Sequence, residues 1–319
     1  MRTKVCKYCQ AIIPKANIIC PICGKSQNKI GSKIVITFLI ICFIGIIGNL
    51  NNEELKKDKL VIHENSQVTN ENDAEVSIEE QLIYDDRNVK IYVKGIEKSG
   101  KGYNVNIYIE NASSLNLGFN AHAYSVNKIM TNNNIYSMNC DVAAGKKANA
   151  KIEIESKFIE NYKIMQIETI DILFWAYDND KGFKSFDTAQ ITLETNLKGE
   201  DTERIIGTNI YSENGLRIDY LYNSDNKYTY CLTNETGTYV DFDIENVTIN
   251  DFTSSEIDYD LVGTIVLNDC QSVFTIEISE DFRFINNIST VEKIEFTISV
   301  RPFEDYSEEW HSDMILLEL

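Results

Sequence analysis

Two segments of the sequence, TIDILFWAY at 169–177 and KIEFTISVR at 293–301, carry the same apolar pattern 124 residues apart. Apolar residues recur at every second position, which is the period of a β-strand with one buried face. The match continues without a gap on both sides of these segments. The matched pairs are Ile152/Ile276, Ile154/Ile278, Ile167/Val291, Ile170/Ile294, Ile172/Phe296, Phe174/Ile298, Ala176/Val300, Phe186/Trp310, Ile191/Ile315 and Leu193/Leu317. A register kept over so many positions indicates an internal repeat.

Each repeat contains further alternating segments separated by turn residues. In the first repeat the turns are marked by SGKG at 99–102, NNN at 132–134, AGK at 144–146 and DNDKG at 178–182. Seven or eight short strands in a segment of about 110 residues are typical of an antiparallel β-sandwich. We therefore expect a mainly β protein with two tandem immunoglobulin-like sandwich domains, at 84–196 and 205–319. One short helix is expected in each, near 156–163 and 279–286.

Charge divides the 319-residue chain into two unlike parts. The formal net charge is −19, from 30 Lys and Arg against 49 Asp and Glu, yet residues 1–52 contain seven basic residues and no acidic one. The remaining residues therefore contain 23 basic and 49 acidic side chains. We do not expect a single globular body from a chain divided in this way. The acidic part also argues against nucleic acid as a partner.

Four of the eight cysteines form two C-x-x-C pairs near the N-terminus, and they are Cys6, Cys9, Cys20 and Cys23. Two such pairs are the ligand set of a tetrahedral zinc site, with thiolates about 2.3 Å from the metal. We therefore predict that these four residues bind Zn²⁺ in a zinc ribbon at 1–28, where the metal supplies most of the folding free energy. A disulfide or a redox C-x-x-C is the alternative, although no βαβ pattern surrounds either pair.

The same segment resembles a short zinc-ribbon family found at the N-termini of many bacterial membrane proteins. The family pattern is matched by Ala11, Ile13, Pro14, Pro21 and Gly24 together with the four cysteines, and the spacing of ten residues between the pairs also agrees. Gln10 and Ile19 depart from the pattern without removing a ligand. The resemblance covers residues 4–25 and implies a zinc module attached to a membrane protein.

An uncharged run of 17 residues, IVITFLIICFIGIIGNL at 34–50, follows the cysteines. As a helix it rises about 25 Å, within the usual range for a membrane span, and it lacks the polar stripe of a buried soluble helix. We predict one transmembrane helix at 30–52, with the lipid bilayer as a partner. A cleaved signal peptide is the alternative. The basic residues before the run predict a cytoplasmic N-terminus and extracytoplasmic C-terminal domains at the cell membrane.

Residues 53–83 are rich in Asn, Glu, Lys, Gln and Ser and are predicted to form a flexible stalk. The order of segments resembles the layout of the teicoplanin-resistance-associated membrane protein family. The repeats also resemble those of uncharacterised zinc-ribbon membrane proteins from low-GC Gram-positive bacteria, through CDVAAGKKAN at 140–149 and FDT at 186–188. These resemblances imply a location in the cell envelope more than an activity.

The residue types of common catalytic sites are present but not in a recognisable arrangement. His63, His122 and His311 lie at positions that do not match between the repeats, so no Ser/His/Asp or Cys/His set follows from them. We therefore expect no enzyme activity and assign no catalytic residue. An envelope hydrolase is the alternative, and it requires a cluster of such groups in one cleft. Cys231 and Cys270 are possible disulfide partners, although their positions do not favour a bond.

One difference between the repeats indicates a binding face. The outward positions of the strand at 169–177 hold Leu173, Trp175 and Tyr177, where the second repeat has polar residues. Exposed aromatic patches mark interaction sites, so these three are candidate partner-binding residues. The alternative is that a loop or the other domain covers them.

These observations together predict a membrane-anchored, envelope-facing binding or sensing protein. Its expected partner is a protein or another envelope component, and the sequence indicates no particular small molecule. The zinc ribbon is expected to be a cytoplasmic structural or docking module. A transmembrane regulator whose ribbon contacts nucleic acid or the transcription machinery is a further alternative.

Overall fold

The computed structural model describes residues 3–5, 12–14, 75–131, 137–199, 204–253, 258–261, 265–302 and 309–319. The chain divides into two compact units, Met1–Thr69 and Asn70–Leu319. In the first unit, strands β1 (Thr3–Val5) and β2 (Ile12–Pro14) pair in antiparallel fashion. The four predicted zinc ligands, Cys6, Cys9, Cys20 and Cys23, and the predicted span at 30–52 lie outside the described residues. Within the described ranges, no helix has the length and apolar character needed to span a membrane.

The second unit consists mostly of β-strands in antiparallel sheets, which confirms the predicted mainly β class. Its first half contains β3 (Gln81–Asp86), β4 (Val89–Ser99), β5 (Gly102–Asn111), β6 (Leu117–Val126), β7 (Ile129–Met130), β8 (Asn139–Val142), β9 (Lys146–Ile154), α2 (Ser156–Asn161), β10 (Thr169–Asp178), β11 (Phe183–Asp187) and β12 (Ile191–Glu194). Its second half contains β13 (Thr208–Glu213), β14 (Leu216–Ser224), β15 (Lys227–Asn234), β16 (Val240–Ile249), β17 (Phe252–Thr253), β18 (Asp258–Leu261), β19 (Ile265–Val266), β20 (Cys270–Glu277), α3 (Glu280–Ile285), β21 (Lys293–Pro302), β22 (Trp310–His311) and β23 (Ile315–Glu318). Both short helices lie where the sequence predicted them.

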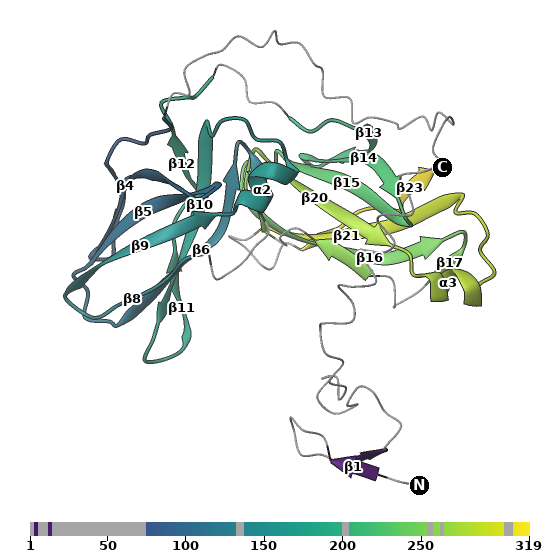
Figure 1. Ribbon diagram of the computed structural model, residues 1–319, viewed down its shortest axis with the longest axis horizontal. Helices are drawn as coiled ribbons and strands as arrows, with labels where there is room; N and C mark the ends of the chain where they lie inside the picture. The colour runs from purple at the N-terminus through teal and green to yellow at the C-terminus, as the bar shows by residue number, and fades with distance from the viewer. Residues whose placement is uncertain are drawn as a thin grey trace, which may run out of the picture. The chain divides into compact units, whose positions relative to one another are not determined.

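Each half of this unit has a two-layered arrangement of strands around its own apolar core (Figure 1). In the first half, β3-β4-β5-β9 forms one layer and β11-β10-β6-β7 the other, with β8 and β12 at the edges. In the second half, β13-β14-β15-β20 faces β17-β16-β21-β22. A parallel bridge between Ile129 of β7 and Gln271 of β20 joins one layer of each half into a continuous sheet. The period of two in the sequence produces this arrangement, because alternate side chains of each strand face the core.

The repeat extends to individual hydrogen bonds of buried side chains. Asn111 and Asn234 are both buried, and each Nδ2 donates to two backbone carbonyl groups at 2.8–2.9 Å. The acceptors are Leu115 and Val142 in the first half, and Thr238 and Val266 in the second. Asn127 and Asn250 repeat a second pattern, in which Oδ1 accepts from two successive backbone N–H groups. These pairs lie 123 residues apart, one fewer than the matched strand positions, so the repeat in sequence corresponds to repeated local structure.

The folded part of the first half begins before residue 84. Val76 and Ile78 are buried in its core, and the backbone N–H of Ser77 donates to Asn196 Oδ1 at 2.7 Å. Residues 75–83, which the sequence analysis assigned to the stalk, thus belong to the second unit. Strand β3 lies at the edge of its sheet and has no continuous buried face, so its sequence lacks the apolar alternation that identifies the other strands.

The three cysteines in the described residues, Cys140, Cys231 and Cys270, are all free thiols. Cys231 is buried although it alternates with core-facing residues along its strand, because β15 is covered on both faces. Tyr162, at the end of α2, lies close enough to Cys231 for its own pKa to be affected. Burial raises the pKa of Tyr162 to about 12, with smaller contributions from Cys231 and Tyr222.

Candidate functional site

The predicted partner-binding residues lie at the junction between the two halves. Leu173 has no exposed surface and belongs to the apolar core of the second half, as do Ala123 and Met130. Trp175 packs against the same core, and Tyr177 lies beside it with a ring-centre separation of 6.1 Å. The second half therefore covers the strand face at Leu173 and Trp175. This is the alternative in which the other domain, and not an outside partner, covers these residues. An outside partner at this face would be confined to the rim around Tyr177.

The indole of Trp175 has close neighbours from adjacent strands. His122 of β6 stacks on it with nearly parallel rings, and Lys184 Nζ of β11 lies 5.0 Å from the centre of the indole. Tyr239 of the second half donates a hydrogen bond to Asp187 Oδ2 at 3.1 Å. These contacts make Trp175 a packing residue of the junction.

The half-buried imidazole of His122 predicts that stability falls in acid. Burial lowers its pKa from 6.5 to about 4, with a smaller contribution from Lys184, while Asp187 opposes the shift. Below pH 6.5 the unfolded chain therefore binds a proton that the folded chain does not, so stability is lost as the pH falls towards 4. We expect a loss of about 2–3 kcal/mol from this residue between pH 7 and pH 4. Urea unfolding at both pH values should show that His122→Gln removes about this much of the pH dependence; an unchanged dependence would contradict the assignment.

A buried polar cluster lies at the same junction. Asp171 of β10 has no exposed surface, and its carboxylate accepts hydrogen bonds from Ser125 Oγ at 2.8 Å and Thr192 Oγ1 at 2.6 Å. Its ion pair with Lys128 Nζ is 3.0 Å long. Burial disfavours the charge of Lys128, but the nearby Asp171 outweighs this effect and the pKa of Lys128 is raised. Cys270 of the second half completes the cluster, with Sγ 3.6 Å from the Asp171 carboxylate.

The cluster holds a cysteine, a carboxylate and a lysine, but its geometry is that of a structural contact. Burial, followed by the charge of Asp171, raises the pKa of the Cys270 thiol, so the thiol is protonated at neutral pH. A nucleophilic cysteine requires the opposite shift and access to solvent. The cluster therefore joins the two halves without providing a reactive group.

Further hydrogen bonds connect the turn before β20 with the first half. The side-chain amide of Gln190 donates to Asn268 O at 3.0 Å and accepts from Asn268 N at 2.8 Å. The backbone N–H of Gln271 donates to Lys128 O at 2.7 Å. Arg204, from the segment between the halves, forms an ion pair with Asp269. The sequence did not indicate this role of residues 268–271, because a contact between distant segments leaves no local pattern.

The remaining candidate for catalysis, His311, lies in the second half. Its Nδ1 is 3.2 Å from Glu245 Oε2, and the side chain is exposed. His122, in contrast, has its contacts with Trp175 at the junction. Within the described residues, no group of three or more His, Cys, Asp or Glu side chains is placed to hold a metal ion.

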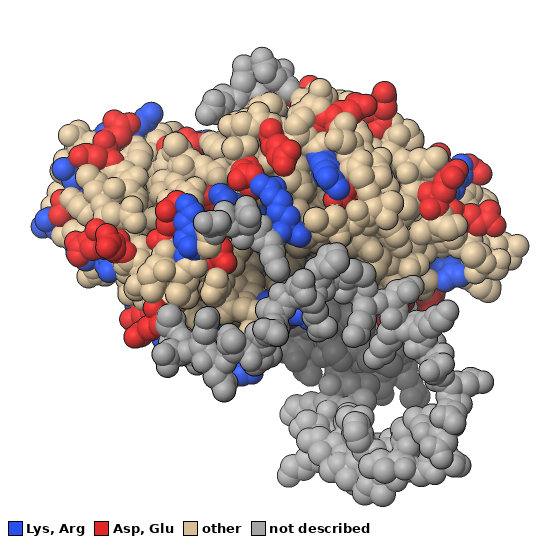
Figure 2. Space-filling model, turned by 90° about the horizontal axis from the view of Figure 1, so that it is seen from above, with Lys and Arg blue, Asp and Glu red and all other residues tan. Residues whose placement is uncertain are grey.

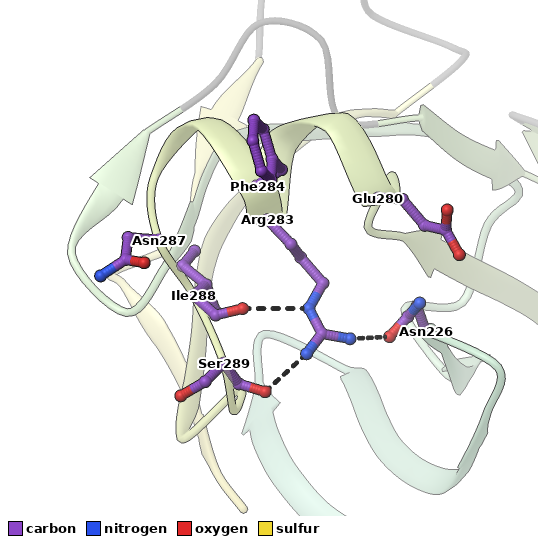
Figure 3. A pocket seen from close by; sticks show the side chains of 7 residues that line it. All are labelled: Asn226, Glu280, Arg283, Phe284, Asn287, Ile288 and Ser289. Atoms are coloured by element: carbon purple, nitrogen blue, oxygen red, sulfur yellow. Dashed lines mark hydrogen bonds between the residues drawn. The ribbon is translucent and has the colours of Figure 1, made fainter.

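A surface pocket of about 360 Å³ lies beside α3 in the second half (Figure 3). It is lined by Asn226, Glu280, Arg283, Phe284, Asn287, Ile288 and Ser289. The guanidinium of Arg283 reaches from α3 to the β14–β15 turn, where Nη1 donates to Asn226 Oδ1 at 2.5 Å. Its Nη2 and Nε donate to the backbone carbonyl groups of Ser289 and Ile288, at 2.6 and 3.4 Å. The sequence predicted the helix but not the pocket.

Two adjacent apolar side chains of α3 project into solvent, and the first of them, Phe284, lines this pocket. Phe284 is 86% exposed and Ile285 is 75% exposed. The corresponding positions of α2, 124 residues earlier, hold the exposed polar residues Glu160 and Asn161. Comparison of the two helices could have revealed this difference from the sequence alone, because the repeat register was already known.

Comparisons with known proteins do not identify the chain. No family model matches it, and no curated protein matches it. Among solved structures, it is similar to the YadV chaperone at 10% identity, covering 68% of this chain and 92% of that one, with a TM-score of 0.23. It is similar to the N-terminal periplasmic domain of ScsB from Proteus mirabilis at 10% identity, covering 75% and 98%, with a TM-score of 0.21. A conserved domain protein from Bacillus anthracis gives 11% identity, 75% and 91% coverage and a TM-score of 0.22. Similarities this weak carry no weight for function.

The distribution of charge gives no sign of a nucleic-acid surface on the face shown in Figure 2. Lys and Arg side chains lie among Asp and Glu there and do not form a continuous basic patch. Binding to a nucleic-acid backbone depends on such a patch. Because the polar groups at the junction are buried, the α3 pocket is a candidate binding site that the described residues present to solvent.

Proposed function

We propose that this chain is a single-pass membrane protein whose extracytoplasmic part binds a protein or another component of the cell envelope. In this proposal two tandem immunoglobulin-like sandwiches, at about 75–199 and 204–319, stand outside the membrane. A zinc ribbon lies in the cytoplasm as a structural or docking module. The hydrogen bonds that recur in the two halves support the duplication. The uncharged run at 34–50 and the basic residues before it support the topology.

The observation that carries the binding function is the exposure of Phe284 and Ile285 beside the pocket. Apolar side chains on a soluble surface gain free energy when a partner removes them from water, by about 25 cal/mol per Å². The first half supplies an internal comparison, because the same helix positions hold Glu160 and Asn161 there. A helix of this fold thus has no structural need for apolar residues at the two sites.

Replacing Phe284 with Glu and Ile285 with Asn, the residues of the first half, tests this function. We expect partner crosslinking on intact cells to fall about tenfold or more, in keeping with the loss of a central apolar contact. The photocrosslinker is placed at Asn287, on the rim of the pocket. The unfolding free energy should change by no more than about 0.5 kcal/mol, since both residues are exposed.

The matched control for this experiment is Glu160→Gln on α2, with the crosslinker at Lys163, the position equivalent to Asn287. It should leave crosslinking from Asn287 unchanged and capture no partner from the first half. Undiminished crosslinking in the Phe284 and Ile285 variant would remove the support for a binding role of α3.

Metal binding provides a separate prediction for the first unit. Val5 pairs with Ile12, so residues 6–11 connect β1 to β2, and the first C-x-x-C pair lies in this connection. A C-x-x-C pair supplies two thiolate ligands of a tetrahedral zinc site. The purified full chain should therefore contain about one zinc ion, and Cys20→Ser should lose most of it.

The control for the metal measurement is Cys140→Ser, which removes a free thiol of the second unit. It should leave the zinc content unchanged. Because the two units are separate, Cys20→Ser should also leave the unfolding of the second unit unchanged. Full zinc content in Cys20→Ser, or none in the unaltered chain, would refute the assignment.

A further inference from the structure

We infer that the α3 pocket recognises a carboxylate that adjoins an apolar group on a protein or peptide, with Arg283 binding the carboxylate. This inference rests on the proposed binding function and adds the chemistry of the ligand. It follows from a comparison of the two halves. In each half side chains connect the short helix to a neighbouring turn, but the charges of these side chains differ.

In both halves a side-chain contact ties the short helix to a neighbouring β-hairpin turn. In the first half Lys101, in the β4–β5 turn, forms an ion pair with Glu160 of α2 at 3.0 Å. In the second half the β14–β15 turn supplies the neutral amide of Asn226, and α3 supplies Arg283. The contact between Lys101 and Glu160 thus has no net charge, whereas the contact between Asn226 and Arg283 keeps one positive charge.

The charge of Arg283 is not cancelled by an ion pair with any described residue. Its three hydrogen-bond acceptors are the Asn226 amide and two backbone carbonyl groups, all of them neutral. A guanidinium has five N–H donors, so two remain for a ligand. Carboxylates are the anions whose geometry an arginine fork matches best among protein groups, and such charge-assisted bonds are stronger than neutral ones.

The surroundings of the guanidinium define the rest of the ligand. Phe284 and Ile285 offer apolar surface next to the pocket, which favours a ligand with an apolar group beside its acid. Glu280 lines the same pocket but forms no ion pair with Arg283, and Figure 3 shows its carboxylate directed away from the guanidinium. Together with the neighbouring Asp281 it would repel a second acidic group. The pocket is therefore suited to a single carboxylate and not to a polyanion.

A substitution at Asn226 can remove recognition of the carboxylate ligand without removing the contact that connects α3 to the β14–β15 turn. Asn226→Asp places a carboxylate at the position that accepts the hydrogen bond from Arg283. The carboxylate cancels the positive charge of the guanidinium and keeps the contact between the turn and α3. Asn226 has a φ of 65°, and Asp tolerates this left-handed conformation nearly as well as Asn. The variant should therefore be as stable as the unaltered chain, but its pocket should no longer attract an anion.

The experiment uses the full chain in detergent and two capped, fluorescent tetrapeptides, Gly-Leu-Glu-Gly and Gly-Leu-Gln-Gly. Anisotropy is measured up to about 1 mM, the affinity range expected of so small a ligand. The Glu peptide should bind at least about fivefold more tightly than the Gln peptide, as one charge-assisted contact predicts. This preference should disappear in Asn226→Asp, while Phe284→Glu with Ile285→Asn should weaken both peptides.

Several results would overturn the inference. Equal binding of the two peptides, binding of neither, or an undiminished preference for the Glu peptide in Asn226→Asp would each exclude recognition of a carboxylate by Arg283. If crosslinking on cells still depends on Phe284 and Ile285, the proposed binding function survives such a result. If that dependence is also absent, both proposals fail.

Discussion

Asp171→Ala is expected to lower the free energy of unfolding of the second unit by about 3–5 kcal/mol. The substitution leaves Lys128, which is mostly buried, with only the longer ion pair to Asp269, at 4.0 Å. It also removes the acceptor of the hydroxyl groups of Thr192 and of Ser125, and Ser125 has no exposed surface. Breaking one side of a buried pair is costly because the desolvated partner remains.

The loss should be measured by urea unfolding of the full chain, together with the reaction of Cys270 with a thiol reagent. Cys270 contacts Asp171 from the second half, so opening of the junction should expose it and increase its reaction rate. Glu295→Ala is the matched control, because Glu295 occupies the equivalent position of β21 and is partly exposed. It should cost no more than about 1 kcal/mol.

A double variant tests whether the cost of Asp171→Ala comes from the buried charge that remains on Lys128. Replacing both partners with apolar residues, as Asp171→Leu with Lys128→Met, should restore most of the stability, since no buried charge is left. A cost below about 1 kcal/mol for Asp171→Ala alone would show that the carboxylate does not hold the junction.

Asn111→Ala and Asn234→Ala are each expected to destabilise the second unit by about 2–4 kcal/mol. Each of these buried side chains satisfies two carbonyl groups and one backbone N–H, and alanine leaves these backbone groups without the asparagine as partner. Because the two residues have the same contacts in the two halves, their costs should agree within about 1 kcal/mol. Thermal or urea unfolding provides the measurement.

Asn149→Ala provides the control for these two substitutions. Asn149 is exposed on β9, so its replacement should change stability by no more than about 0.5 kcal/mol. A similar small effect at Asn111 or Asn234 would mean that water replaces the lost hydrogen bonds. A large effect in only one half would show that the repeated bonds are not equivalent in energy.

The sequence predicted much of the fold because alternate residues of most strands face the apolar core of their own half. Ile170, Ile172 and Phe174 alternate with residues that face away from the core of the first half, and the same pattern at 293–301 reveals the repeat. Strand β3 was missed for the complementary reason, since its edge position removes the alternation. Both short helices were located from the interruption of the strand pattern before the strands at 169 and 293.

The candidate site was less accessible to sequence reasoning. Leu173 and Trp175 were correctly recognised as unsuited to water, but the pattern could not distinguish an outside partner from the other half of the same chain. Phe284 and Ile285 lie in a helix too short to show a periodic face. The pocket beside them depends on Asn226, which is distant from α3 in the sequence.

The linear order of residues determined the strand content, and it predicts the duplication and the metal ligands, since each of these depends on spacing between residues along the chain. Only the tertiary structure decided that Asp171 and Cys270 meet in a buried contact and that Arg283 keeps an uncancelled charge. Packing brings such groups together from distant segments, and the energy of a charge depends on which groups surround it.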